Sequence, residues 1–155
     1  MKTFKQLVEE CSQHIHELFP WDLTERLAKE NFLIIDIREP DEYNAMHIAD
    51  SINVPRGILE TACEYDYEDT VPTLAAARDQ AIVLVCRSGN RSVFATDVMQ
   101  QMGYKQVWSL KTGLRGWNDS EQPLVDNQGK TVSLEAADDY FSVKLRTEQY
   151  KPKNT

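Results

Sequence analysis

The stretch Ala81-Ile82-Val83-Leu84-Val85-Cys86-Arg87-Ser88-Gly89-Asn90-Arg91-Ser92 determines how the rest of the chain is interpreted. Its first five residues are apolar, and a short run of this kind is typical of a buried strand in a parallel sheet. A cysteine follows directly, and then a polar loop that contains one glycine. An amphipathic run from Ser92 to Met102 predicts a helix. The stretch therefore predicts a strand, a loop and a helix, with Cys86 at the start of the loop.

The predicted position of Cys86 favours a reactive thiol. The carboxyl end of such a strand faces the amino end of the next helix, where unpaired N–H groups and the helix dipole favour negative charge. Arg87 and Arg91 add positive charge on either side of the loop. Free cysteines are usually inert core residues, but the polar neighbours of Cys86 are unsuited to a core. We therefore expect a nucleophilic thiolate at position 86, a hypothesis that requires access from solvent.

Length and composition limit the classes of protein. A chain of 155 residues is long enough for one domain with a sizeable core. The 17 Lys and Arg against 25 Asp and Glu leave a net charge of −8, which argues against nucleic acid or a membrane as a partner. No apolar run reaches the roughly 18 residues that span a bilayer, and the amino terminus lacks the pattern of a signal peptide.

The cysteines indicate a reducing compartment. The chain has three, Cys11, Cys63 and Cys86, which are too few and too widely spaced for a disulfide framework. No Cys-x-x-Cys pair offers ligands for zinc. We expect a cytoplasmic protein without a metal or other cofactor.

Strands and helices are predicted to alternate along the chain. Apolar runs predict strands at residues 32–38, 51–55, 81–85 and 107–110. Helices are predicted between them, at residues 40–46, 56–63, 73–78 and 92–102, and a short last one at 113–117. This order predicts an α/β fold with a mainly parallel sheet. Ligands of such sheets collect at the carboxyl ends of strands, where both Cys86 and the pair Asp36 and Arg38 fall.

Both ends of the chain predict further helices. Apolar residues at steps of three and four predict one helix over residues 4–19, ended by Pro20, with Cys11 in the core and both His14 and His16 in solvent. Asp22 is suited to cap a second short helix. Near the other end, a helix capped by Ser133 is predicted to bury one stripe against the domain or a second subunit: Leu134, Ala137, Phe141 and Leu145. Residues 151–155 are predicted to fray.

Four motifs together resemble the rhodanese (thiosulfate sulfurtransferase) family in its single-domain form. They occur in the family's order: Asp36-Ile37-Arg38-Glu39-Pro40-Asp41-Glu42-Tyr43, His47-Ile48-Ala49-Asp50-Ser51-Ile52-Asn53-Val54-Pro55, Cys86-Arg87-Ser88-Gly89-Asn90-Arg91-Ser92 and Gly113-Leu114-Arg115-Gly116-Trp117. The chain departs from the family at Gly113-Leu114, where two glycines are usual, and at Asp50-Ser51, where glycine and alanine are usual. The resemblance implies a rhodanese-like domain over residues 22–123, with a helical extension at 1–21 and a second helical extension with a frayed tail at 124–155.

The resemblance also implies a fold and an activity. The fold would be a central five-stranded, mainly parallel sheet with helices on both faces. Cys86 would be the catalytic residue of a sulfurtransferase, which takes sulfur from thiosulfate or a related donor as a persulfide and passes it to a thiol or cyanide. The loop Arg87, Ser88, Gly89, Asn90, Arg91 and Ser92 would bind substrate and persulfide, with the two arginines orienting an oxyanion donor.

Supporting roles stay open at several positions. Asp36 is expected to bind loop N–H groups and Arg38 to pair with Glu42 or Glu39, with direct substrate contact as the alternative. Ser92 is expected to cap the helix rather than act in catalysis. Structural roles are expected for His47 and Trp117. The acidic residues 64–69 are interpreted as a solvated face or a rim over the active site, and Cys63 as a core or surface residue or a relay thiol.

Two other functions compete with sulfur transfer. Cysteine phosphatases and arsenate reductases resemble the loop but separate cysteine from arginine by five residues, whereas four residues lie between Cys86 and Arg91 and Ser92 stands at the phosphatase position. The tighter loop favours a single sulfur atom over a phosphate. The other alternative is a binding or regulatory module that keeps the fold without turnover.

Overall fold

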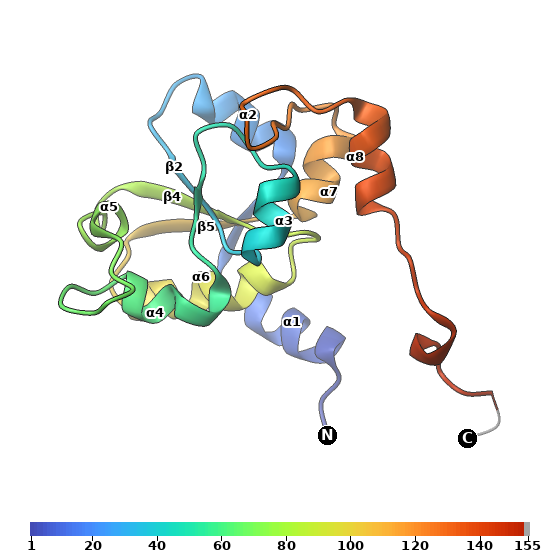
Figure 1. Ribbon diagram of the computed structural model, residues 1–155. Helices are drawn as coiled ribbons and strands as arrows, with labels where there is room; N and C mark the ends of the chain where they lie inside the picture. The colour runs from blue at the N-terminus through green and yellow to red at the C-terminus, as the bar shows by residue number, and fades with distance from the viewer. Residues whose placement is uncertain (154–155) are drawn as a thin grey trace.

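A five-stranded parallel sheet organises residues 1–153, which the computed structural model describes (Figure 1). The strand order is β1-β5-β4-β2-β3. The central strand β4 (Ala81–Val85) lies between β5 (Gln106–Leu110) and β2 (Leu33–Asp36), while β1 (His16–Leu18) and β3 (Ile52–Asn53) form the edges. The predicted α/β fold with a parallel sheet is confirmed.

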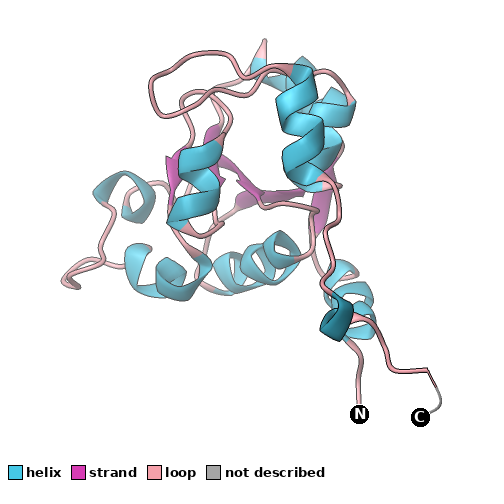
Figure 2. Cartoon of the chain, turned by 45° about the vertical axis from the view of Figure 1, so that its right-hand side comes forward, coloured by secondary structure: helices cyan, strands magenta, loops and turns pink. Residues whose placement is uncertain are grey.

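Helices cover both faces of the sheet (Figure 2). On one face lie α4 (Leu59–Ala62), which follows the 3-10 turn η1 (Arg56–Ile58), α5 (Pro72–Ala75) and α6 (Arg91–Gln101). On the other lie α2 (Pro20–Leu27), α7 (Gly113–Asp119) and α8 (Leu134–Phe141). Successive residues of β4 point to opposite sides, so Ile82 and Leu84 enter one core cluster and Val83 and Val85 the other. Burial on both faces explains the continuous apolar run in the sequence.

The amino-terminal region differs from the single helix predicted over residues 4–19. Helix α1 (Phe4–Ser12) ends early, and β1 pairs in parallel with β5 in the register His16↔Trp108 to Leu18↔Leu110. The prediction is wrong because the open edge of β5 provides backbone partners that the apolar spacing does not reveal. His14 and His16 are exposed as predicted. Cys11 is half-buried at the interface of α1 with α6, where its thiol donates to the Val93 carbonyl at 3.6 Å.

The ends of helices α2 and α8 can be compared with the predictions. Helix α2 begins at Pro20, and Asp22 in its first turn accepts the Phe19 N–H at 3.3 Å. Ser133 caps α8 by accepting the Ala136 N–H at 3.1 Å, as predicted. Ala137 and Phe141, the last residue of α8, are buried as predicted, but Leu134 and Leu145 are exposed, so the prediction that these two belong to the buried stripe is wrong.

The carboxyl-terminal segment leaves the domain after α8. It contains the 3-10 turn η2 (Thr147–Gln149) (Figure 1). The one helix not yet described, α3 (Pro40–Ala45), follows β2 and precedes β3 in the chain. Of the residues predicted to fray, 154 and 155 lie outside the described part of the chain. Within residues 1–153, no helix has the length and apolar character needed to cross a bilayer.

Candidate active site

Cys86 is the first residue after the central strand, and residues 86–92, here called the Cys86 loop, run from the end of β4 into the first turn of α6. The loop turns through Gly89, whose φ of +81° is strained for other residues. A Cβ at Gly89 would lie 2.8 Å from the Thr112 nitrogen, so the loop packs closely against the turn between β5 and α7. The strand, loop and helix predicted for this stretch are confirmed, with α6 beginning at Arg91.

The Cys86 sulfur lies among hydrogen-bonding groups at the start of α6. The Ser92 N–H donates to Sγ at 3.4 Å, and the thiol donates to Ser92 Oγ at 3.3 Å. Ser92 Oγ is in turn 2.7 Å from Ser109 Oγ on β5, and both serines are fully buried. When the sulfur is ionised, the Ser92 hydroxyl can rotate to donate to it while accepting from Ser109. Ser92 is therefore a hydrogen-bond partner of the sulfur. Its prediction as the helix cap is wrong, because Asn90 precedes the helix and Ser92 is already its second residue.

Access to the sulfur is through a small pocket. Cys86 is only 1 % exposed as a residue, yet it lines a pocket of about 160 Å³. The other residues that line the pocket are Phe4, Arg87, Ser88, Asn90 and Arg91. The access that the thiolate hypothesis requires is thus limited to molecules that enter this pocket.

Arg91 points toward α3 rather than standing free over the loop. Its two terminal nitrogens each donate to a Glu42 oxygen at 2.9 Å, the bidentate arrangement that a planar guanidinium group forms with a carboxylate. Burial opposes ionisation of Glu42, but hydrogen bonds from Arg91 and from the Glu39 N–H hold the pKa of its carboxyl below the usual range. The hydrogen bond to Glu42 likewise raises the pKa of Arg91. This ion pair ties the start of α6 to α3.

Arg87 connects the loop to the carboxyl end of α8. One terminal nitrogen donates to the carbonyls of Phe141 and Ser142, at 3.2 and 3.1 Å. A cation is stabilised there by the unpaired carbonyls and the negative end of the helix dipole. Both arginines that the sequence assigned to a donor oxyanion therefore have partners within the chain.

Asp36 and Arg38 form a buried ion pair beside the loop. Both are fully buried, the Arg38 side chain donates to both Asp36 oxygens, and its shortest contact is 2.7 Å. Asp36 also accepts the Arg38 N–H, and Arg38 donates to the Met46 carbonyl. The predicted pairing of Arg38 with Glu42 or Glu39 is wrong. Since the Ile37 N–H donates to the Val85 carbonyl, the pair stabilises the end of β2 next to Cys86.

The start of α7 holds the backbone of the Cys86 loop. The Leu114 N–H donates to the Cys86 carbonyl and the Arg115 N–H to the Arg87 carbonyl, both at 2.9 Å. Gly113 has a φ of +60°, and a Cβ there would lie 2.6 Å from backbone atoms of Cys86 and Arg87. Only glycine therefore fits at this contact.

A family model for the rhodanese-like domain matches residues 20–120. The chain belongs to the rhodanese-like domain family. A sulfurtransferase from Allochromatium vinosum is 30% identical over 116 residues, which cover 74% of this rhodanese-like chain and 99% of the relative. A mitochondrial relative from Schizosaccharomyces pombe, provisionally named a thiosulfate sulfurtransferase, is 33% identical over 90 residues, which cover 56% of this chain and 63% of the relative.

A solved structure has the same fold. It is a protein of unknown function from Rhodopseudomonas palustris, described as a possible tyrosine phosphatase, with a TM-score of 0.68 and 28% sequence identity. The match covers 79% of this chain and 94% of that protein. The family model and this structure thus establish the single-domain rhodanese-like fold, and the relative from Allochromatium vinosum establishes the relationship to sulfurtransferases.

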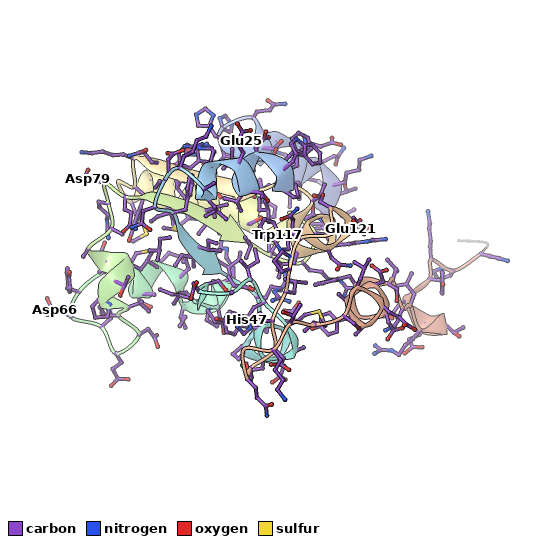
Figure 3. All side chains as sticks on the ribbon, turned by 90° about the horizontal axis from the view of Figure 1, so that it is seen from above. Glu25, His47, Asp66, Asp79, Trp117 and Glu121 are labelled. Atoms are coloured by element: carbon purple, nitrogen blue, oxygen red, sulfur yellow. The ribbon has the colours of Figure 1, made fainter. Side chains whose placement is uncertain are left out.

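The other residues that the sequence analysis singled out in this rhodanese-like chain do not line the Cys86 pocket. His47 Nδ1 lies 2.8 Å from the Tyr43 carbonyl, and Trp117 is buried, as predicted. Cys63 is fully buried, and burial raises the pKa of its thiol. Residues 64–69 are exposed and do not line the Cys86 pocket. Figure 3 shows Asp66 of this segment at the end of the molecule away from Trp117 and Glu121. The solvated-face interpretation is confirmed.

Sequence analysis did not identify Ser109, Glu42 and Phe4 as neighbours of the site. Ser109 had a signal, because it is a polar residue in a strand that the apolar pattern predicts to be buried. Glu42 was considered only as a partner of Arg38. Phe4 had no signal beyond its place in an apolar helical stripe. Among residues 1–153, no group of three or more His, Cys, Asp or Glu is arranged to hold a metal ion.

Proposed function

We propose that the protein transfers a sulfane sulfur from thiosulfate or a related donor to a thiol or cyanide, through a persulfide on Cys86. The observation that carries the proposal is the position of Cys86 Sγ, which lies in a small pocket within reach of the Ser92 N–H and hydroxyl. These groups favour a sulfur anion at the start of α6. Membership of a family with sulfurtransferase relatives supports the same activity.

The reaction has two nucleophilic steps. In the first, the Cys86 thiolate attacks the outer sulfur of thiosulfate, the bond between the two sulfur atoms breaks, and sulfite leaves with the bonding electrons. The terminal sulfur of the persulfide then carries the negative charge, and the pocket holds it beside the N–H groups of the Cys86 loop. In the second step, cyanide or a thiolate attacks that sulfur, and the Cys86 thiolate is the leaving group.

The arginines affect which donors suit the site. Arg91 is paired with Glu42, and one nitrogen of Arg87 is bound to the end of α8. A donor with a small sulfur-bearing end therefore suits the pocket better than one that needs two free guanidinium groups. The same pairing argues against phosphate-ester chemistry, in which a free arginine neutralises the transferred phosphoryl group.

Mass spectrometry of the intact protein tests the proposal. After incubation with thiosulfate, we expect the protein to gain the mass of one sulfur atom and to lose it when cyanide is added. Cys86→Ser should show no gain, whereas Cys11→Ser should behave like the unaltered chain. A persistent lack of sulfur loading by thiosulfate and by small persulfides would refute the proposal. Hydrolysis of a phosphate ester without sulfur loading would favour a phosphatase. Inactivity in both assays would favour a binding module.

The relay through Cys63 has a separate test. Cys63 is buried, and its thiol has a raised pKa, so it is a poor second nucleophile. We expect Cys63→Ser to retain repeated turnover, and a protein that loads sulfur but cannot release it would support the relay instead.

We further propose a cytoplasmic location, which the three unpaired cysteines support. A small sulfur donor and a thiol acceptor are the proposed partners. The homodimer through the terminal helices stays a prediction, for which solution scattering is the direct measurement.

A further inference from the structure

Phe4 is the one residue lining the Cys86 pocket, within residues 1–153, that does not belong to the Cys86 loop. It is the first residue of α1, which precedes the segment that the family model matches. Figures 1 and 2 show α1 beside the amino-terminal end of α6, where the loop ends. An element outside the matched domain thus contributes part of the wall around the reactive sulfur.

Helix α1 packs against α6, the helix that begins in the Cys86 loop. None of its residues is fully buried. The Phe4 ring lies against Phe94, with 6.4 Å between the ring centroids, and the Cys11 thiol donates to the Val93 carbonyl on the same helix α6. Thr3 caps the amino end of α1, where its side chain accepts the Gln6 N–H. A helix of nine residues held in this way is a wall that can move at low cost.

The Phe4 ring supplies the large apolar surface of the pocket. The other lining residues are polar or charged apart from Cys86 itself, and Arg91 is held by Glu42. Phe4 is 58 % exposed, so its ring is in contact with the pocket on one side and with solvent on the other. The size of molecule that reaches Sγ therefore depends on where this ring lies.

We propose that Phe4 is a specificity-determining residue that limits the size of the molecules reaching Cys86. Small reagents enter beside the ring, whereas larger ones require α1 to shift away from α6. Applied to the proposed sulfur transfer, on which this extension rests, small donors and acceptors are admitted directly and bulky thiols only when α1 moves. The size limit itself concerns access to the thiol and holds for any chemistry at Cys86.

Thiol alkylation tests the size limit without sulfur transfer. The rates of modification at Cys86 are measured by peptide mass mapping with iodoacetamide as the small reagent and N-pyrenylmaleimide as the bulky one. Phe4→Ala should raise the rate with the maleimide about fivefold, a modest change because only part of the ring is buried. The rate with iodoacetamide should rise less than about twofold, because this small reagent already enters beside the ring. Phe4→Trp should lower the rate with the maleimide.

Leu7→Ala is the matched control. Leu7 is a partly exposed apolar residue of the same helix, but it does not line the Cys86 pocket. The control should leave the ratio of the two rates unchanged. An unchanged ratio in Phe4→Ala would overturn the proposal. Equal acceleration in Leu7→Ala or Phe4→Trp would also overturn it, since general loosening of α1 would then be the cause.

Sulfur discharge separates this inference from the proposed function. In protein loaded with sulfur, Phe4→Ala should accelerate discharge by glutathione more than discharge by cyanide. If the unaltered protein takes up no sulfur, the proposed function fails while the alkylation ratios still decide the role of Phe4. If loading is normal and the ratios do not change, the role of Phe4 fails alone.

Discussion

Replacing Gly113 by alanine tests whether α7 holds the Cys86 loop in place. The new Cβ would lie 2.6 Å from the carbonyl oxygens of Cys86 and Arg87 and from the carbonyl carbon of Arg87. These are backbone atoms, which cannot rotate away as a side chain would. The loop and the start of α7 must therefore separate, and the hydrogen bonds from Leu114 and Arg115 to these carbonyls must lengthen.

Gly129→Ala provides the reference for the cost of the backbone conformation. Its φ of +76° is as unfavourable for alanine as the +60° of Gly113, but a Cβ there has no neighbour within 4 Å. Left-handed backbone costs an L-residue about 1–2 kcal/mol, and both variants carry this cost. Overpacking adds about 1–3 kcal/mol, and only Gly113→Ala carries it. The free energy of unfolding should thus fall by about 1–3 kcal/mol more in Gly113→Ala than in Gly129→Ala.

Urea unfolding followed by tryptophan fluorescence measures both variants, and thiosulfate loading reports the state of the loop. We expect Gly113→Ala to lose most of its sulfur loading under conditions where it is still folded, and Gly129→Ala to load normally. Equal destabilisation of the two variants, or full loading by Gly113→Ala, would show that the contact between α7 and the loop does not position Cys86.

Three other perturbations test the contacts of charged side chains around the site. Asp36→Asn should lower the free energy of unfolding by about 3–5 kcal/mol because it leaves Arg38 buried without its partner, and Asp36→Asn with Arg38→Met should cost less than the sum of the single changes in a urea double-mutant cycle. Glu42→Gln should cost about 1 kcal/mol near pH 7, a modest value because Arg91 is 37% exposed. The pKa of Glu42 is lowered by folding, so its contribution is present above the pKa of an unfolded glutamate and is lost as the pH falls through the folded-state value. The difference between the two proteins should therefore shrink below about pH 4, and a constant difference would contradict the ion pair. Arg87→Ala should speed amide hydrogen exchange at the carboxyl end of α8, because it removes the hydrogen bonds to the Phe141 and Ser142 carbonyls. Exchange in α5 is the control and should not change, and unchanged rates in α8 would show that the contact is dispensable.

The local order of residues in the sequence was sufficient to predict the fold and the position of Cys86. Buried strands and amphipathic helices alternate, and each is defined by the spacing of its own residues. The cysteine directly after the central strand and the glycine in the following loop belong to one short stretch. Since a parallel sheet brings the carboxyl ends of its strands to one edge, the placement of Asp36 near Cys86 also followed.

Contacts between distant segments were decided only by the tertiary structure. The segment His16–Leu18 is a strand because it pairs with β5, about ninety residues further along the chain. The partners of Arg38, Arg91 and Arg87 were likewise not evident, because the sequence offers each arginine many carboxylates and backbone carbonyls as acceptors. Which acceptor is used depends on where the helices pack.

By itself, the sequence determined the parallel α/β architecture and the position of Cys86 at the end of the central strand, since both depend on residues that are neighbours in the chain. Only the tertiary structure decided that Phe4 borders the pocket, that Ser109 completes the hydrogen bonds around the sulfur, and that Gly113 touches the loop. The physical reason is that these contacts form after long segments have closed on one another, so their geometry is set by the packing of whole elements and not by local spacing.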